Sequence, residues 1–250
     1  MGDRSGIEWT DATWNPTTGC DRTSPGCDNC YALTLAKRLK AMGQPKYQTD
    51  GDPRTSGPGF GVAVHHQTLE LPYTWTSPRT VFVNSMSDLF HPQIPVEFIK
   101  QVFEVMADTP QHTYQVLTKR SRRLVNLADA LPWPPNVWMG VSVENDRYVF
   151  RAEHLRQVDC AVRFLSVEPM LGPVPSLELE GVSWVIVGGE SGPDARPMEP
   201  DWARDVRDRC IAARVPFFFK QWGGRTPKAN GRLLDGRTHD DYPVPVTLSA

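Results

Sequence analysis

Two similar stretches decide the fold class: VWMGVSVEN at residues 137–145 and VRFLSVE at residues 162–168. Residues 137–143 and 162–167 are short and nearly continuous in apolar character, as strands buried on both faces are. Residues 146–157 between them have the apolar spacing of a helix. A strand, a helix and a second strand in this order predict two parallel strands joined by a crossover helix.

The same alternation continues on both sides of this unit. Apolar runs predict four further strands, at residues 80–84, 114–118, 184–187 and 216–219. Helical periodicity predicts four further helices, at residues 31–40, 96–107, 121–130 and 201–214. This alternation predicts an α/β fold with a full or partial (β/α) barrel. A doubly wound open parallel sheet is the alternative.

Composition places the chain among ordinary globular proteins. The 250 residues are 40% hydrophobic and 22% charged, with a formal net charge of −2. This charge argues against wholesale wrapping of nucleic acid but leaves room for a local basic site. The sequence has neither a membrane-length apolar run nor the apolar stretch of a secretory signal. We therefore expect a cytoplasmic location and no membrane partner.

The predicted domain organisation is simple. Residues 1–224 form a single barrel-like catalytic domain, interrupted by a long Gly/Pro-rich loop at residues 43–61. Loops of this length in a compact domain are usually functional. Residues 225–250 form a polar, turn-rich C-terminal tail.

Polar side chains recur where the predicted strands end. Because the carboxyl ends of parallel strands meet on one rim, we expect these side chains to share an active site. A scatter of solvated loop residues would not repeat glutamate and lysine at equivalent offsets. The predicted rim residues are Asn84, Ser85, Asp88, Lys119, Ser142, Glu144, Glu168, Glu190 and Lys220.

Three of the five cysteines lie within eleven residues, at Cys20, Cys27 and Cys30. Clustered cysteines in a chain without an export signal indicate a metal-binding or catalytic site. The glycines and proline of this segment suit a loop that wraps a metal centre, whereas Cys160 and Cys210 lie in apolar segments typical of the core. Structural zinc usually takes four ligands, and only His65 and His66 are near enough in sequence to complete it. Three thiolates on an iron–sulfur cluster instead leave one iron open.

With these residues the chain resembles the radical S-adenosylmethionine (SAM) superfamily. The resemblance rests on Cys27-x-x-Cys30 with the aromatic Tyr31 beside it, at the start of a barrel. More narrowly, the chain is similar to a phage-associated three-cysteine family over roughly residues 7–224. The shared motifs are Trp14-Asn15-Pro16, the cysteine loop, residues 83–91 and Gly188-Gly189-Glu190-Ser191-Gly192.

The resemblance implies a 4Fe-4S cluster on Cys20, Cys27 and Cys30 and reductive cleavage of SAM to a 5′-deoxyadenosyl radical. Tyr31 would pack beside the cluster, and Lys119 would hold the SAM carboxylate. Both Asp88 and Glu190 remain candidates for the SAM amino group, with Asn84 and Ser85 at the same strand end as Asp88. Hydroxyl and carboxylate pairs suit the ribose: Ser142 with Glu144, or Ser166 with Glu168. We take Glu144, Glu168 and Lys220 as the catalytic candidates.

Substrate and partners are less strongly indicated. The basic run at residues 119–123 and the aromatic side chains of Trp133, Trp138 and Trp222 favour a nucleotide or an extruded nucleic-acid base. With such a substrate, the expected reaction is modification or repair of a base. The resemblance also implies a reductant such as flavodoxin or ferredoxin and a separately encoded partner protein.

Two other functions stay open. A metal-dependent barrel hydrolase would use Asp88, Glu144, Glu168 and Glu190 as ligands, and its activity would survive replacement of the cysteines. A zinc-stabilised binding protein would unfold on chelation.

Overall fold

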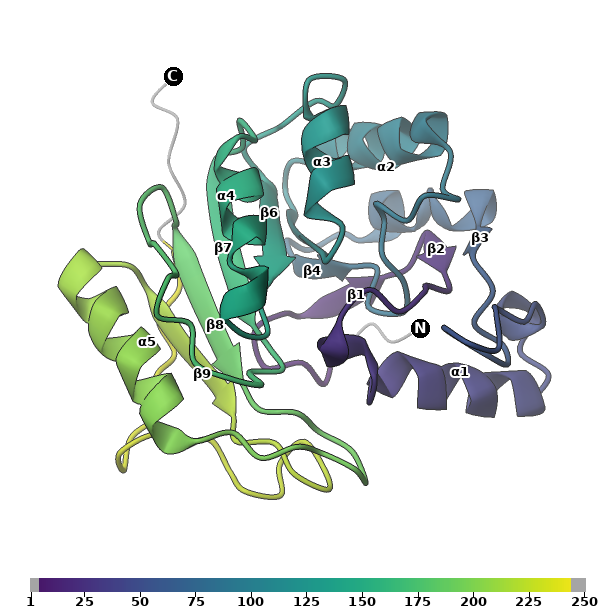
Figure 1. The fold of residues 1–250 in the computed structure, drawn as a ribbon. Helices are drawn as coiled ribbons and strands as arrows, with labels where there is room; N and C mark the ends of the chain where they lie inside the picture. Colours follow the sequence, from purple (N-terminus) through teal and green to yellow (C-terminus); the bar gives the residue numbers. More distant parts are fainter. Residues whose placement is uncertain (1–4, 244–250) are drawn as a thin grey trace.

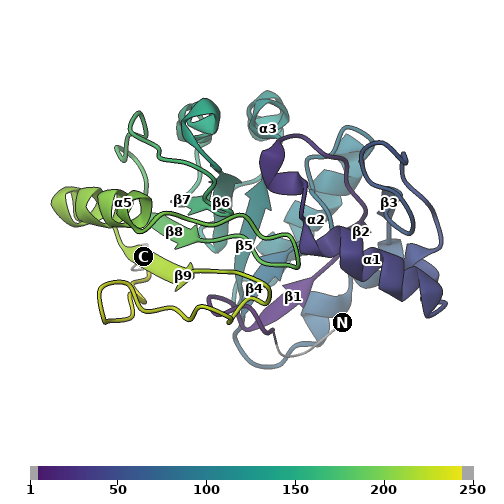
Figure 2. The same cartoon turned by 60° about the horizontal axis from the view of Figure 1, so that its bottom comes forward.

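Seven parallel strands form the central sheet of the computed structural model, which describes residues 5–243. The sheet order is β1-β4-β5-β6-β7-β8-β9, and the sheet curls into a half-barrel (Figure 1, Figure 2). The prediction of an α/β fold with a partial (β/α) barrel is confirmed. The strands are β1 (Ala12–Trp14), β4 (Thr80–Val83), β5 (Thr113–Thr118), β6 (Val137–Ser142), β7 (Val162–Val167), β8 (Trp184–Gly188) and β9 (Phe217–Gln221).

Four helices cover the outer face of the sheet, and a fifth lies near the carboxyl ends of the strands (Figure 2). The outer helices are α2 (Val96–Asp108), α3 (Ser121–Ala128), α4 (Phe150–Arg156) and α5 (Pro200–Ala213), and the fifth is α1 (Tyr31–Ala41). The helix predicted at residues 146–157 is in fact a 3₁₀ turn, Asp146–Tyr148, followed by α4. Asn145 caps this turn by accepting a hydrogen bond from the Arg147 N–H at 3.1 Å.

Strand β1 is absent from the sequence-based prediction. It has three residues and pairs only with β4 at the edge of the sheet. Such a short segment gives no usable periodicity. Its position nevertheless matters, because β1 leads directly into the cysteine loop and makes β4 the second parallel strand. A small antiparallel pair, β2 (Thr17–Thr18) and β3 (Ala63–Val64), follows β1 and holds the start of that loop.

Alternate side chains along each strand enter two different cores. Those on the outer face pack against the helices, as Val141, Leu165 and Val187 do. Those on the inner face form a second, aromatic cluster without helix residues. A doubly wound sheet would need helices on both faces, so the curled sheet instead packs its inner face against itself. The inner cluster comprises Trp9, Phe82, Trp138, Val162, Phe164, Trp184, Ile186 and Phe218.

The inner face changes from aromatic to polar along the strands. Phe82 on β4 is followed by Asn84 just after the strand, and Phe218 on β9 is followed by Lys220, and both polar side chains line the cavity. Close packing of the aromatic layer requires a glycine at 140, where a Cβ would lie 2.4 Å from the ring of Phe164. The aromatic layer therefore closes the amino end of the half-barrel and leaves the carboxyl end polar.

Two further segments pack onto this frame. The loop at residues 43–61 contains a 3₁₀ turn, Pro45–Tyr47, and buries Tyr47 and Phe60 against α1. Of the C-terminal tail, Leu234 and His239 are buried, and the His239 carbonyl accepts the Phe219 N–H at 2.9 Å. Residues 244–250 of that tail lie outside the described residues. Within residues 5–243, none of the helices combines the length and apolar character that crossing a bilayer requires.

Candidate active site

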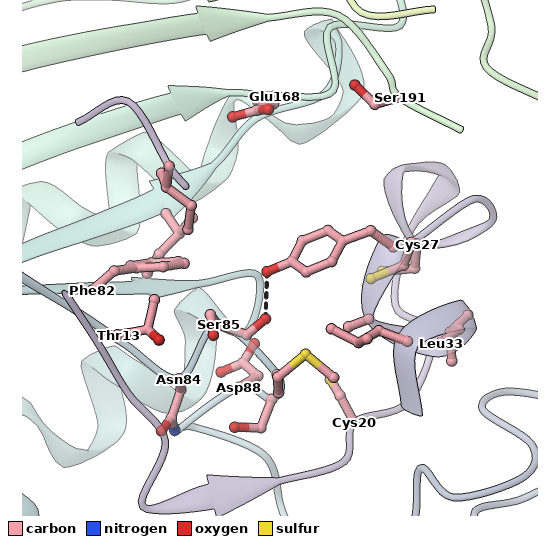
Figure 3. Close-up of a pocket in the computed structure, with 18 of the residues that line it drawn as sticks. Thr13, Cys20, Cys27, Leu33, Phe82, Asn84, Ser85, Asp88, Glu168 and Ser191 are labelled. Carbon is pink, nitrogen blue, oxygen red and sulfur yellow. Dashed lines mark hydrogen bonds between the residues drawn. The ribbon is translucent and has the colours of Figure 1, made fainter. Parts of the chain in front are cut away.

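A cavity of about 1260 Å³ lies at the carboxyl ends of the strands, between the sheet and the cysteine loop (Figure 3). Its floor is the end of the aromatic layer, and its walls combine apolar side chains with the polar groups at the strand ends. The structure brings to it every predicted site residue except Glu144. These are Cys20, Cys27, Cys30, Tyr31, Asn84, Ser85, Asp88, Lys119, Ser142, Glu168, Glu190 and Lys220.

The three cysteines come from one loop between β2 and α1. Cys27 ends a 3₁₀ turn, and Cys30 occupies the residue before the first turn of α1. Tyr31 then crosses to β4, where its hydroxyl donates to the Ser85 carbonyl oxygen at 2.5 Å (Figure 3). In residues 5–243, no three His, Cys, Asp or Glu side chains converge closely enough to hold a single metal ion. The thiols share a cavity without meeting at one point.

The thiols differ in their electrostatic surroundings. Burial raises the pKa of Cys20 to about 12. Burial also raises the pKa of Cys27, but Lys119 and the backbone N–H groups of Thr23 and Ser24 outweigh it, and the pKa falls below its usual range. Burial lowers the pKa of Lys119, yet nearby Glu144, Cys27 and Cys30 raise it above its usual range. Lys119 is thus a stable cation facing the cysteine loop.

Glu144 is fully buried behind the cavity wall. Its Oε1 accepts the Ser24 hydroxyl at 2.6 Å, and its Oε2 pairs with the Arg151 guanidinium at 2.9 Å. Ser24 lies between Cys20 and Cys27, so this carboxylate fastens the middle of the cysteine loop to the end of β6. A Cβ on Gly26 would lie 2.6 Å from the Glu144 Cγ, so the loop packs directly on this side chain.

Glu190, after β8, fastens the other end of the loop. Asn29, between Cys27 and Cys30, donates to Glu190 Oε2 at 2.9 Å, and Arg196 pairs with both oxygens. Arg196 also donates to the Pro25 carbonyl at 2.8 Å. Burial raises the pKa of Glu190, but the bonds from Arg196 and Asn29 outweigh it and lower the pKa below its usual range. The Glu190 carboxylate is therefore already paired with a cation, the Arg196 guanidinium.

Asp88 has a similar internal role. Its Oδ1 accepts the Thr118 hydroxyl at 2.7 Å, and its Oδ2 accepts the Lys119 N–H at 3.1 Å. Asp88 therefore joins the ends of β4 and β5. Arg120, two residues after Thr118, donates to the Asp21 carbonyl at 3.1 Å and so adds a third attachment of the cysteine loop.

Glu168 and Lys220 form an ion pair across β7 and β9, with 2.6 Å between Oε1 and Nζ. Both line the cavity and are only partly buried. The four carboxylates of the predicted hydrolase thus each bind a partner of their own. They are not collected around a common point, and the geometry does not favour that alternative.

Among residues 5–243, two buried amide oxygens beside the cavity lack a hydrogen-bond partner. One is Oδ1 of Asn84, whose Nδ2 donates to the Thr17 hydroxyl at 2.9 Å. The other is Oε1 of Gln221, at the end of β9. Both side chains are 4% exposed. An unpaired buried acceptor costs about 1–3 kcal/mol.

Sequence reasoning missed several of these residues. Asn29 lies inside the cysteine motif, and Gln221 follows the predicted Lys220. The position of each residue in the sequence therefore indicated that it could belong to the site. Arg151 and Arg196 gave no such indication, because neither belongs to a motif or to the polar residues at a predicted strand end. Trp133, Trp138 and Trp222 do not line the cavity, and Arg123 binds the Ile94 carbonyl at 2.6 Å. Trp9 and Phe82 supply the aromatic wall instead.

Comparison with known proteins found a matching family model and solved structures with a similar fold. A family model described as "Protein of unknown function (DUF5131)" matches residues 4–243. No curated protein matches the chain. A solved cysteine-to-serine mutant of spore photoproduct lyase is 17% identical, with a TM-score of 0.51, over 86% of this chain and 65% of that chain. Spore photoproduct lyase complexed with dinucleoside spore photoproduct is 16% identical, with a TM-score of 0.45, over 78% and 59%.

The likeness to spore photoproduct lyase is one of fold. This chain spans about 65% of that enzyme's length. The likeness covers the curled parallel sheet of the half-barrel.

Proposed function

The chain belongs to the family described as "Protein of unknown function (DUF5131)", and we propose that it is a radical SAM enzyme acting on a nucleotide or nucleic-acid base. The narrower membership of a phage-associated three-cysteine family is part of this proposal. One observation carries it: Cys20, Cys27 and Cys30 line a single cavity at the carboxyl end of a parallel half-barrel. The fold likeness to spore photoproduct lyase supports it.

The donor set suits a 4Fe-4S cluster. Thiolates are the protein ligands of such clusters. Each thiolate of a cubane binds a different iron, so the thiols need not converge on one point, and they do not. When bound and reduced, the cluster supplies the electron that cleaves SAM into methionine and a 5′-deoxyadenosyl radical.

The chain's own residues would bind and orient SAM. Lys119, which faces Cys27 and Cys30, would pair with the SAM carboxylate. Because Asp88 and Glu190 already have partners, Asn84 and Ser85, which line the cavity after β4, are the remaining candidates beside the SAM amino group. Ser142, Ser166 and Glu168 line the same wall and suit the ribose hydroxyls.

Glu144 has a positioning role in this proposal, because it contacts the cysteine loop and lies outside the cavity lining. Glu168 and Lys220 remain the candidates for contact with substrate. The apolar floor, with Trp9 and Phe82, suits a flat ring such as a base. A one-electron reductant such as flavodoxin or ferredoxin would complete the system.

Metal content tests the proposal. After anaerobic reconstitution, we expect about four irons and four sulfides per chain and a broad visible absorption. The Cys20→Ala/Cys27→Ala/Cys30→Ala variant should lose both, and Cys160→Ala, which changes a buried cysteine outside the loop, should retain both. Stoichiometric zinc without iron in the anaerobically purified protein would contradict the proposal.

A further inference from the structure

Residues 49–61, here named the clasp segment, belong to the long Gly/Pro-rich loop that follows α1. The segment lies beside that helix (Figure 1), where the Asp50 carboxylate pairs with Lys40 at 2.5 Å. Within the segment, the Asp52 carbonyl accepts the Ser56 N–H at 2.8 Å. The clasp segment is therefore a defined turn held on α1, and neither the half-barrel nor the proposed SAM contacts give it a role.

The clasp segment contacts the cysteine loop on both sides of Cys20. Before Cys20, a Cβ added to Gly19 would lie 2.1 Å from the Gly61 carbonyl oxygen, so the two backbones are in direct contact. After Cys20, the Arg22 N–H donates to the Thr55 carbonyl at 3.3 Å. The backbone that carries Cys20 is thus held between two contacts with the same segment.

Asp21, the residue next to Cys20, makes the side-chain contacts between the two segments. Its Oδ1 accepts the Thr55 hydroxyl at 2.7 Å and the Ser56 hydroxyl at 3.1 Å. Both hydroxyls donate in these bonds, because a carboxylate oxygen only accepts. One oxygen of Asp21 therefore binds two donors from the clasp segment.

The other oxygen of Asp21 binds His91, the last residue of the motif at residues 83–91. Asp21 Oδ2 lies 2.9 Å from Nε2 of this ring, which is 2% exposed. His91 Nδ1 accepts the Gln93 N–H at 3.2 Å, so Nε2 carries the proton of the neutral ring and donates it to the carboxylate. Asp21 thus joins the clasp segment to the buried chain that follows β4.

The other two cysteines are held by different contacts. Ser24, before Cys27, binds the carboxylate that follows β6. Asn29, before Cys30, binds the carboxylate that follows β8. Neither contact involves the clasp segment. Removing the contacts of the clasp segment should therefore displace Cys20 and leave the other two attachments of the cysteine loop in place.

Resting on the proposed function, we propose that Asp21 is a positioning residue, which sets the Cys20 thiolate for the iron–sulfur cluster by binding the clasp segment and His91 together. Cys20 belongs to no helix or strand, so the contacts of its neighbours fix its position. Loss of the groups that hold a metal ligand typically weakens metal binding by about 10–100-fold. An open clasp would leave the iron–sulfur cluster with two of its three thiolates.

Iron content after anaerobic reconstitution tests this role. Asp21→Ala and Thr55→Val/Ser56→Ala both remove the hydroxyl contacts, and we expect each variant to hold less than half the iron of the parent protein. Asp21→Asn should retain most of the iron, because an amide can accept on one side and donate to the hydroxyls on the other. Thr76→Val/Ser77→Ala, at an exposed pair of the same residue types, should match the parent protein.

Thiol labelling of the metal-free protein gives a readout that does not depend on iron. Labelling by iodoacetamide is followed at each cysteine by peptide mass spectrometry. In Asp21→Ala we expect the rate at Cys20 to rise about fivefold, because opening the clasp exposes this thiol. The rates at Cys27 and at the buried Cys160 should stay within about twofold of the parent protein. A purely structural role for Asp21 would raise all three rates together.

Full iron content in Asp21→Ala would overturn the inference, and so would a rise in labelling shared by Cys27 and Cys160. Failure of the proposed function is distinguishable, because the parent protein itself would then bind no iron, whatever the labelling shows. If the parent protein binds iron and Asp21→Ala binds as much, the positioning role alone is wrong.

Discussion

At the scale of single residues, one sequence pattern predicts Glu144, Glu168 and Glu190 as equivalent carboxylates, yet their surroundings differ. Glu144 binds Ser24 and Arg151 in the core, and Glu190 binds Arg196 and Asn29 at the loop. Glu168 lines the cavity in an ion pair with Lys220 in which both side chains are partly exposed. The sequence predicts that such residues share a rim, because parallel strands end together. It does not predict their partners, several of which, such as Ser24 and Asn29, come from distant segments.

The buried pair of Glu144 and Arg151 gives a stability prediction. Glu144→Gln leaves the guanidinium of Arg151 buried with no carboxylate, and breaking a buried pair costs about 3–5 kcal/mol. We expect the free energy of unfolding, measured in urea, to fall by an amount of that order. Glu178→Gln, at an exposed pair with Arg156, should change it by less than about 1 kcal/mol. Similar losses in the two variants would contradict the anchoring role of Glu144.

His65 gives a prediction about pH. Burial lowers its pKa to about 4, and its Nε2 contacts the Thr18 hydroxyl at 2.8 Å. The folded state therefore keeps this ring neutral, whereas the unfolded chain takes up a proton below its ordinary pKa of 6.5. Stability is complete above pH 6.5 and is lost as the pH falls towards 4, by an amount on the order of 3 kcal/mol.

Urea denaturation between pH 7 and pH 4 measures this dependence. His65→Gln should give a shallower decline, because glutamine does not titrate and still reaches the hydroxyl. His66→Gln, at the exposed neighbour, should decline as steeply as the parent protein. An unchanged slope in His65→Gln would show that other groups cause the acid sensitivity.

At the scale of elements, the helices and most strands follow from periodicity, whereas the cysteine loop does not. The loop is fastened at Asp21, Ser24 and Asn29 to the ends of three different strands. Sequence can predict its ligands from composition and spacing. It cannot predict these attachments, because each one depends on the curl of the finished sheet. The edge strand β1 escapes prediction for the same reason, since pairing with β4 defines it.

Gly26 tests how closely the loop must fit. In Gly26→Ala the new Cβ would meet Glu144, which Ser24 and Arg151 prevent from moving aside. We expect the reconstituted variant to hold less than half the iron of the parent protein. Gly6→Ala is the matched control, since nothing lies within 4 Å of its added Cβ. Full iron content in Gly26→Ala would show that the loop position is not critical.

At the scale of the whole molecule, the half-barrel separates structural and chemical roles along its strands. Aromatic side chains close the amino end, and polar side chains from the loop and from most of the strands meet at the carboxyl end. The sheet stays open between β1 and β9, and the cavity at its carboxyl end has a volume of about 1260 Å³. The sequence predicts the barrel class, with which the fold likeness to spore photoproduct lyase agrees, and it predicts the rim residues that line the cavity.

The formation of 5′-deoxyadenosine from SAM tests the central claim most directly. Protein reconstituted anaerobically and reduced with dithionite should produce it, because SAM cleavage often proceeds without the true substrate. Cys27→Ala should reduce production to the level without protein, and Cys160→Ala should retain it. If parent protein with full iron content formed no more 5′-deoxyadenosine than Cys27→Ala, the account of this site as a radical SAM centre would be wrong.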